Sequence, residues 1–360
     1  MAERKARMTE KERVEALIRH EKPDRVPIWP FAETSYAAYA QISIADTYNN
    51  PAAALDGQRR TCDYFQWVCA PWIGYAAYGG WEFGGDIKWP SGEYAQAPAI
   101  TRYPVEKVED VYKVKLPDVK TAGFTPIEKE FYDLAVKEGF DNEPFNVTIF
   151  PGAAVFSIAA NICGPGTFCK WLLKEPEAVH HLLRLAEDHC IDKTRYFKSI
   201  YGIEGVLPMG GEATTDNRLI SAKQFEEFAL PYLKEAYQKV LDMGYKVIYS
   251  HICGEQNANL PFWAQIPMGE PGIISIGHEI EIETAAEYFP DHIILGNLEP
   301  AKLQVETPEE IYEASRDLVE RGKKIAGGFI YSPGCGMPPM APIENMMAMT
   351  RAVNDFGWYE

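Results

Sequence analysis

Short apolar segments alternate with helical patterns from residue 125 to the end of the chain, and this alternation limits the fold more than any other feature. Strands that are each followed by a helix pair in parallel, because the helix carries the chain back to the same end of the sheet. About eight such units, without a break in composition, predict a single (β/α)8 barrel domain over residues 1–360. The predicted helices cover residues 125–138, 166–174, 176–200, 221–243, 256–264, 281–288, 307–322 and 342–355, and the predicted strands cover residues 146–151, 205–209, 245–252, 272–275, 292–296 and 324–331.

A doubly wound open sheet is the alternative architecture for the same alternation of strands and helices. No G-x-G-x-x-G motif follows a predicted strand, which counts against the dinucleotide-binding form of that sheet. The N-terminal part adds a helix that Thr9 and Glu12 open as a capping box, a strand over residues 25–31 and a helix over residues 52–64.

Residues 64–105 differ from the rest of the chain, because many aromatic side chains lie there among many glycines. We predict a β-rich or irregular insertion over the mouth of the barrel. Its rings either pack on one another as a small subdomain or line an apolar pocket for a flat or aromatic substrate. The first interpretation is favoured slightly, with some of the rings serving both roles.

A histidine and two cysteines follow predicted strands. His251 and Cys253 end the apolar run 245–250, and Cys335 follows the run 324–331. Residues i and i+2 of a strand point to the same face, so the first two can aim at one point that Cys335 reaches from a neighbouring strand end. Glycines and prolines frame Cys335, which favours a thiol presented by backbone geometry. One imidazole and two thiolates, with one position left over, suit a catalytic zinc ion.

The fourth zinc ligand stays open. Glu212 also follows a predicted strand end and could close the coordination sphere when substrate is absent, so it is predicted as a metal-binding and catalytic residue together with His251, Cys253 and Cys335. In a (β/α)8 barrel the chemistry sits at the carboxyl ends of the strands, where all four residues fall. Competing side chains, for each of which a solvent-exposed position is the simpler interpretation, are Glu255, Glu270, His278 and Glu279.

The net charge of −17, from 52 acidic and 35 basic residues, makes the chain a poor partner for nucleic acid or an anionic membrane. No run approaches the ~18 apolar residues of a membrane span, and the charged N-terminal segment lacks the apolar core of a signal peptide. Seven cysteines in such a chain predict free thiols in a reducing cytoplasm. Apart from the two at the strand ends they are expected to be small buried residues, with Cys163 and Cys169 flanking a loop-like Gly-Pro-Gly stretch.

Five groups of residues form family motifs: Thr9 to Val14 with Pro23 to Pro27, Leu219 to Ser221 with Phe225 to Phe228, His251 to Gly254, Gly296 to Pro300, and Gly334 to Gly336 with Pro342 to Asn345. Together they resemble the uroporphyrinogen decarboxylase superfamily over nearly the whole chain, which implies a TIM barrel of that type. Within the superfamily the His-x-Cys … Cys set is similar to the branch of zinc-dependent, corrinoid-linked methyltransferases. That branch's zinc ligands fall on His251, Cys253 and Cys335.

The decarboxylase branch itself fits the chain poorly. It holds substrate carboxylates with arginines just after the first strand, whereas no arginine lies between Arg25 and Arg59 here. A decarboxylase-like enzyme is therefore a lesser alternative. A non-catalytic zinc-containing barrel that only binds a corrinoid protein is another.

The methyltransferase branch implies Zn²⁺ and a corrinoid, as methylcobalamin or Co(I) cobalamin, supplied by a partner protein. No D-x-H-x-x-G motif, which resembles a corrinoid site, occurs in this chain, so a separate corrinoid protein is expected. The small-molecule partner is either a methyl donor or a methyl acceptor. The rings of residues 64–94 favour an aryl methyl ether as donor, that is, O-demethylation, and the alternative is a thiol acceptor such as coenzyme M. A homodimer is also compatible with the resemblance.

Overall fold

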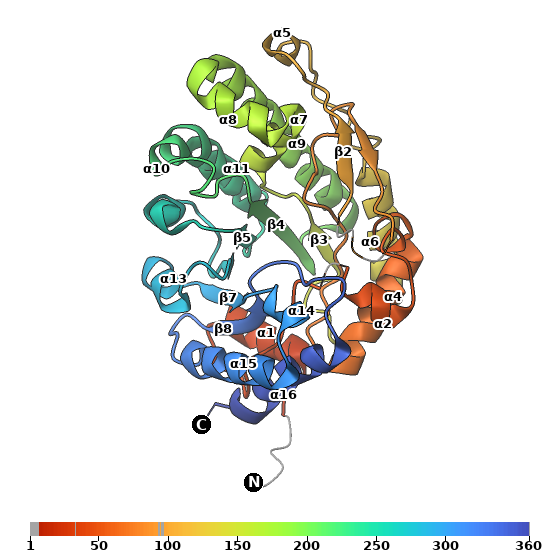
Figure 1. Cartoon of the computed structure of the whole chain (residues 1–360), viewed down its shortest axis with the longest axis vertical. Coiled ribbons are helices and arrows are strands. Elements are labelled where there is room, and N and C mark those ends of the chain that lie inside the picture. The colour runs from red at the N-terminus through yellow and green to blue at the C-terminus, as the bar shows by residue number, and fades with distance from the viewer. Residues whose placement is uncertain (1–6, 33, 93, 95–96, 360) are drawn as a thin grey trace.

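The computed structural model describes residues 7–32, 34–92, 94 and 97–359. Its core is a six-stranded parallel sheet whose strands lie side by side in their order along the chain. Each strand is followed by at least one helix, and Figure 1 shows the helices arranged around the central strands. The strands are β3 (Val147–Ile149), β4 (Val206–Glu212), β5 (Tyr249–Ile252), β6 (Ile273–Ile276), β7 (Ile293–Leu298) and β8 (Phe329–Pro333).

Two extended segments of the N-terminal part continue this sheet from β8. Ile28 forms a parallel bridge with Tyr331, and the N–H of Trp29 donates to the carbonyl oxygen of Tyr331 over 3.0 Å. On the other side of the same segment, the N–H of Val68 donates to the carbonyl oxygen of Ile28 over 2.7 Å. Six regular strands and two such segments together form the barrel, so the predicted (β/α)8 fold is confirmed.

The strand predicted over residues 25–31 forms only isolated bridges, which corrects the expectation of a regular strand. Pro27 and Pro30 lack the N–H group that a continuous ladder of hydrogen bonds requires. Pairing in this segment is therefore limited to single positions such as Ile28.

Three other strands are shorter than predicted, and the run 146–151 forms a strand only over Val147–Ile149. The run 245–252 becomes a strand only at Tyr249, and the run 324–331 only at Phe329. Just before Phe329 the chain turns at Gly328, whose φ of +101° is a backbone conformation that glycine adopts at little cost.

The helices agree well with the predicted ranges, and α6 covers the predicted residues 125–138. The helix predicted over residues 221–243 is divided by a π-helical turn, η1. None of the described helices is long and apolar enough to cross a membrane. Helices of the N-terminal part are α1 (Glu10–Ile18), α2 (Tyr36–Ala40), α3 (Asp46–Asn49), α4 (Pro51–Phe65), α5 (Val108–Val111) and α6 (Thr125–Glu138). Those that follow β3 are α7 (Val155–Cys163), α8 (Pro165–Lys174), α9 (Pro176–Tyr201), α10 (Ala222–Gln224), η1 (Phe225–Ala229), α11 (Leu230–Asp242), the 3-10 turn η2 (Asn257–Asn259), α12 (Leu260–Trp263), α13 (Ile282–Tyr288), α14 (Lys302–Val305), α15 (Pro308–Gly322) and α16 (Ile343–Phe356).

Helix α7 was not predicted from the sequence, and helix α8 corrects an expectation. Every residue of α7 except Ser157 is buried, so no alternation of polar and apolar faces marks this helix in the sequence. The stretch between Cys163 and Cys169 was expected to be loop-like, but α8 begins at Pro165 and only Gly164 separates the two helices. A proline at the first helical position loses no hydrogen bond, which is why the helix can start there.

The aromatic-rich segment between α4 and α5 contains one regular unit among its described residues, an antiparallel pair of β1 (Asp86–Lys88) and β2 (Ala99–Arg102). The remainder consists of turns and irregular backbone. That residues 64–105 are an insertion into a single barrel domain stays a prediction. Residues 93 and 95–96 of this segment lie outside the described residues, as do residues 1–6, 33 and 360.

Candidate functional site

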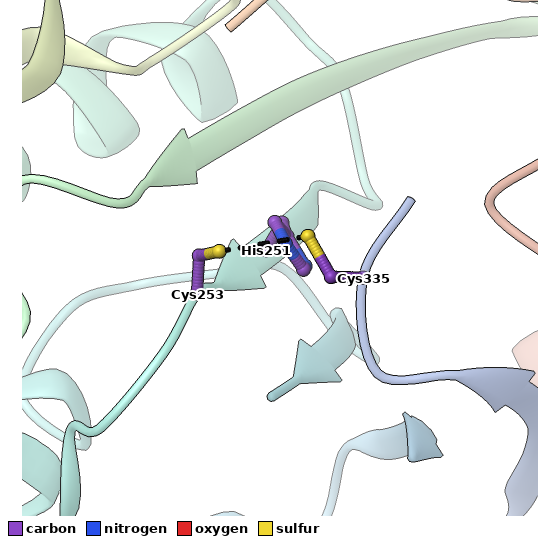
Figure 2. A group of neighbouring side chains, drawn as sticks. All are labelled: His251, Cys253 and Cys335. Carbon is purple, nitrogen blue, oxygen red and sulfur yellow. Dashed lines mark hydrogen bonds between the residues drawn. The ribbon is translucent and has the colours of Figure 1, made fainter. Parts of the chain in front are cut away.

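The histidine and the two cysteines predicted as zinc ligands lie together at the carboxyl ends of β5 and β8. In Figure 2 the side chains of His251, Cys253 and Cys335 approach one another from these two strand ends. The sulfur atoms of Cys253 and Cys335 are 3.7 Å apart, and the candidate ligand atoms of all three residues lie within 4.8 Å of one another. The structure therefore brings the three side chains together, while their role as metal ligands stays a prediction.

The spacing of the two sulfurs fits a bound zinc ion. Zinc binds thiolates at about 2.3 Å with tetrahedral geometry, so two sulfurs on one zinc ion stand about 3.8 Å apart. The 3.7 Å between Cys253 and Cys335 is close to this value. A zinc ion could therefore bind both sulfurs with little movement of the backbone.

His251 offers the third ligand atom. Its Nδ1 lies 2.9 Å from Oγ of Ser275, which neighbours it on β6. Its buried Nε2 has no hydrogen-bond partner among the described residues. A ring that donates from Nδ1 keeps a free lone pair on Nε2, and a buried polar atom without a partner costs free energy unless it binds a ligand. Nε2 is thus ready to bind a metal ion.

Local backbone and electrostatics favour a thiolate at Cys335. The pKa of this thiol lies well below its usual range, because Cys253 donates a hydrogen bond to it and His251 stands close by. The thiolate is the form that binds metal ions. The loop also passes close to the end of β6, since a Cβ atom at Gly334 would lie 2.7 Å from the backbone nitrogen of His278. Only glycine permits that approach.

Glu212, the predicted fourth ligand, ends β4 and is fully buried. Its carboxylate accepts hydrogen bonds from the N–H of Phe156 at 2.9 Å, and from the N–H and hydroxyl of Ser157 at 2.8 and 2.7 Å. It therefore caps the N-terminus of α7, and burial raises its pKa to about 7. Glu212 is not part of the cluster of ligand atoms, and its service as a fourth ligand stays a prediction.

The competing candidates and the other cysteines have different surroundings. Glu255 accepts hydrogen bonds from the backbone and side chain of Asn257, and Glu279 pairs with Arg218 at 3.0 Å. The remaining thiols of the described chain are free, and they are buried at Cys62, Cys69, Cys163 and Cys190 and half-buried at Cys169.

A pocket with about 620 Å³ of empty space, part of it open to solvent, lies against the cluster. One side is formed by His251, the two cysteines and Glu212, and the other side is aromatic. No lysine or arginine is present among the described residues that line it, so the pocket offers apolar surface and no cation. Its rings belong to Phe31, Trp72, Tyr75, Tyr78 and Phe150.

The aromatic-rich segment serves two roles. Trp72, Tyr75 and Tyr78 line the pocket, whereas Trp81 and Trp89 pack edge to face with ring centroids 5.9 Å apart. Some rings of the segment thus form the pocket wall and others stabilise the segment itself.

The sequence matches the family model of uroporphyrinogen decarboxylase (URO-D) over residues 9–356. The chain belongs to the uroporphyrinogen decarboxylase family. Within it, the methylcobamide:CoM methyltransferase MtbA of Methanosarcina acetivorans is 29% identical over 97% of this chain and 98% of that protein. A uroporphyrinogen decarboxylase of Anaeromyxobacter dehalogenans is 25% identical over 95% of this chain and 98% of that protein. A solved methyltransferase from Methanosarcina mazei superimposes with a TM-score of 0.76 at 19% identity, over 97% of this chain and 99% of that one.

Membership of the uroporphyrinogen decarboxylase family confirms the resemblance inferred from the motifs. The superposition confirms the fold. The prediction of a methyltransferase is confirmed at the level of enzyme class, because relatives of that name in two Methanosarcina species match nearly the full chain.

Two groups at the site were missed from the sequence. Ser275 contacts the ring of His251 from the neighbouring strand, and the signal that could have found it is a single hydroxyl in the apolar run Ile273–Ile276. Ser157 binds the carboxylate of Glu212 from the start of α7, a helix that the sequence pattern did not reveal.

Proposed function

We propose that this member of the uroporphyrinogen decarboxylase family is a zinc-dependent methyltransferase that moves a methyl group between a small molecule and the cobalt of a corrinoid protein. The observation that carries the proposal is the cluster of one imidazole nitrogen and two sulfurs that faces an apolar pocket at the mouth of the barrel. The names of the methylcobamide:CoM methyltransferases that match the full chain support it.

The residues of the cluster would hold zinc through Nε2 of His251 and the sulfurs of Cys253 and Cys335, with Ser275 fixing the imidazole ring. Two thiolates and a neutral imidazole balance the charge of the ion, which suits exchange of a weak fourth ligand. When bound, zinc would supply Lewis acidity at the heteroatom that carries or receives the methyl group. When no substrate is bound, the carboxylate of Glu212 would leave the N-terminus of α7 and bind zinc as the fourth ligand.

For the small molecule we propose an aryl methyl ether. The aromatic walls suit a flat apolar group, and the described lining residues provide no cation for a negatively charged one. In the reaction Co(I) of the corrinoid attacks the methyl carbon, the cobalt–carbon bond forms and the carbon–oxygen bond breaks. The electron pair of the broken bond stays on oxygen as phenolate, and cobalt is oxidised from Co(I) to Co(III).

Methylation of a thiol is the second candidate, and the names of the relatives favour it, since they are coenzyme M methyltransferases. Coenzyme M carries a sulfonate, and an anion that is buried without a counter-charge is strongly disfavoured. Arg218, whose guanidinium lies close to Gly254 beside the cluster, does not supply that counter-charge. Arg218 is already paired with Asp216 and Glu279. A neutral thiol would fit the pocket better than a sulfonated one.

The corrinoid is proposed to come on a separate protein that meets the mouth of the barrel, because the chain lacks a D-x-H-x-x-G motif. The purified chain should accordingly be colourless and should not retain cobalamin. A cytoplasmic location and a homodimer stay predictions.

An anaerobic spectrophotometric assay tests the function. The zinc-loaded chain is mixed with Co(I) cobalamin and, in separate reactions, with methoxylated aromatics or methylamines, and methylcobalamin is mixed with thiols, including coenzyme M and a neutral thiol. We expect formation of methyl-cobalt from a methoxylated aromatic. Consumption of methyl-cobalt by thiols alone would select the second candidate. If no methyl transfer occurs in either direction and no substrate changes the zinc absorption edge, the alternative of a non-catalytic zinc-containing barrel is selected.

A further inference from the structure

A buried lysine stands behind the aromatic wall of the pocket. Lys193 of α9 pairs with Glu128 of α6 at 2.5 Å between Nζ and Oε2, and both side chains are 0% exposed. Burial raises the pKa of Glu128 to about 7, against the opposing effect of the lysine. A buried ion pair adds little net stability compared with apolar residues of the same size. Stabilisation alone therefore explains this pair poorly.

The ammonium group of Lys193 contacts both halves of the wall. It donates a hydrogen bond to the carbonyl oxygen of Phe150, and it lies 4.3 Å from the ring centroid of Tyr78. Phe150 follows β3, whereas Tyr78 belongs to the aromatic-rich segment between α4 and α5. Both rings line the pocket and meet edge to face, with their centroids 6.3 Å apart.

A second side chain of α9 holds the same tyrosine. His189 lies one helical turn before Lys193, and its Nε2 is 3.0 Å from the hydroxyl oxygen of Tyr78. Burial, together with the charge of Lys193, lowers the pKa of His189 to about 3, so its ring is neutral. Tyr78 is thus fixed at its hydroxyl by one residue of α9 and at its ring face by another.

We propose that Lys193 is a positioning residue that sets the separation of Tyr78 and Phe150, and thereby the shape of the pocket that receives the methyl-carrying group. Lys193 itself does not line the pocket, so it acts through the ring of Tyr78 and the backbone that carries the ring of Phe150. The inference rests on the proposed function in one respect, namely that this pocket is the substrate site.

The test uses Lys193→Met together with the double variant Lys193→Met/Glu128→Gln. The single variant leaves a buried carboxylate without its partner and is expected to lower stability, whereas the double variant restores charge balance. In the double variant we expect a normal melting temperature and zinc content, and a kcat/KM lowered about tenfold or more, chiefly through KM. The substrate is the methoxylated aromatic that the wild-type chain demethylates.

Lys198→Met is the matched control. Lys198 lies on the same helix and donates to a backbone carbonyl, that of Met243, but it is not among the residues of the wall. Its replacement should leave KM unchanged. If Lys193 only stabilised α9, its replacement and that of Lys198 would have similar effects on KM.

Two results would overturn the proposal. One is a folded, zinc-loaded double variant with wild-type kcat and KM. The other, decisive if the double variant does not fold, is a Tyr78→Leu variant with unchanged KM, which would show that the wall does not contact substrate. A wild-type chain without transfer activity would count against the proposed function instead, and the role of Lys193 would then be measured by calorimetric binding of methoxylated aromatics.

Discussion

The two ends of the barrel carry polar clusters of opposite kind. At the floor, where α1 meets the first barrel segment, Arg13 and Arg25 share the carboxylate of Glu10, and Asp24 accepts from Nε of Arg13 over 2.7 Å. At the mouth, Nε2 of His251 has no hydrogen-bond partner among the described residues, and two thiols face each other. The floor charges are matched within the chain, whereas the mouth presents atoms that can bind a ligand.

This contrast assigns different tasks to the two ends. Matched buried charges hold the chain together: at the floor Glu10 of α1 pairs with Arg25, and backbone hydrogen bonds from Val26 to Gly357 and from Tyr359 to Asp24 tie the segment around Arg25 to the C-terminal residues. Ligand-ready atoms at the carboxyl ends of strands are where barrel enzymes place their chemistry. Changes at the floor should therefore alter unfolding free energy, and changes at the mouth should alter metal binding and rate.

The largest effect is expected for Cys335→Ser. A serine hydroxyl stays protonated at neutral pH and is a poor zinc ligand, so zinc content should fall strongly and methyl transfer should fall below detection. Elemental analysis and the corrinoid assay measure both quantities, and the melting temperature of the metal-free protein should stay close to wild type. Cys169→Ser, outside the cluster, is the control. Full zinc content in Cys335→Ser would contradict the assignment of a zinc site to the mouth of the barrel.

The next largest effect is expected at the floor for Glu10→Gln. The change leaves two buried guanidinium groups without their shared carboxylate, which should lower the free energy of unfolding by about 3–5 kcal/mol. Urea denaturation measures the loss, and kcat/KM of the folded protein should not change. Lys129→Met removes a partly exposed pair with Asp133 and should cost less than about 1 kcal/mol. A loss of zinc in Glu10→Gln would contradict the division of tasks.

Local patterns in the sequence predicted the parts of this structure that depend on local interactions. The capping box of Thr9 with Glu12 opens α1, and the period of residues 125–138 predicts α6. The i, i+2 spacing of His251 and Cys253 predicted their convergence with Cys335, because strand geometry and the barrel rule place all three at one end.

Features that depend on distant contacts were not predictable in this way. Helix α7 is buried nearly all round and shows no polar face, and the carboxylate of Glu212 reaches it across a separation of 56 residues. The residues around Pro27 show a strand composition but lack donors. Lys193 lies in a helix whose sequence does not reveal that α6 and the aromatic segment cover it.

The pH dependence of stability is expected to reflect His189, which contacts Tyr78 in the aromatic wall of the pocket. Folding lowers the pKa of His189 from 6.5 to about 3, so the unfolded chain takes up the proton first. The contribution of the neutral ring is therefore complete above about pH 6.5 and is lost as the pH falls toward 3. Between about pH 7 and pH 4.5 this amounts to about 2–3 kcal/mol.

His189→Phe should remove this part of the pH dependence. Urea unfolding at both pH values, for wild type and variant, isolates it from the titration of other groups. His181→Phe on the same helix, where the half-buried histidine ring meets the ring of Tyr112 at an interplanar angle of 47°, should behave like wild type. Parallel profiles of wild type and His189→Phe would show that the ring is already charged in the fold or that its burial is relieved.

The smallest effect is expected for Ser275→Ala, which tests how far metal binding at the mouth depends on the orientation of the His251 ring. The change removes the hydroxyl at 2.9 Å from Nδ1 of His251 and leaves all three ligand atoms in place. Groups that orient a metal-binding histidine are worth about 10- to 100-fold in metal affinity or activity, and stability should hardly change. Competition with a chromophoric chelator measures the affinity, and Ser250→Ala on β5 is the control. Unchanged affinity in Ser275→Ala would mean that packing, such as the ring of Phe31 at 5.6 Å, holds the imidazole instead.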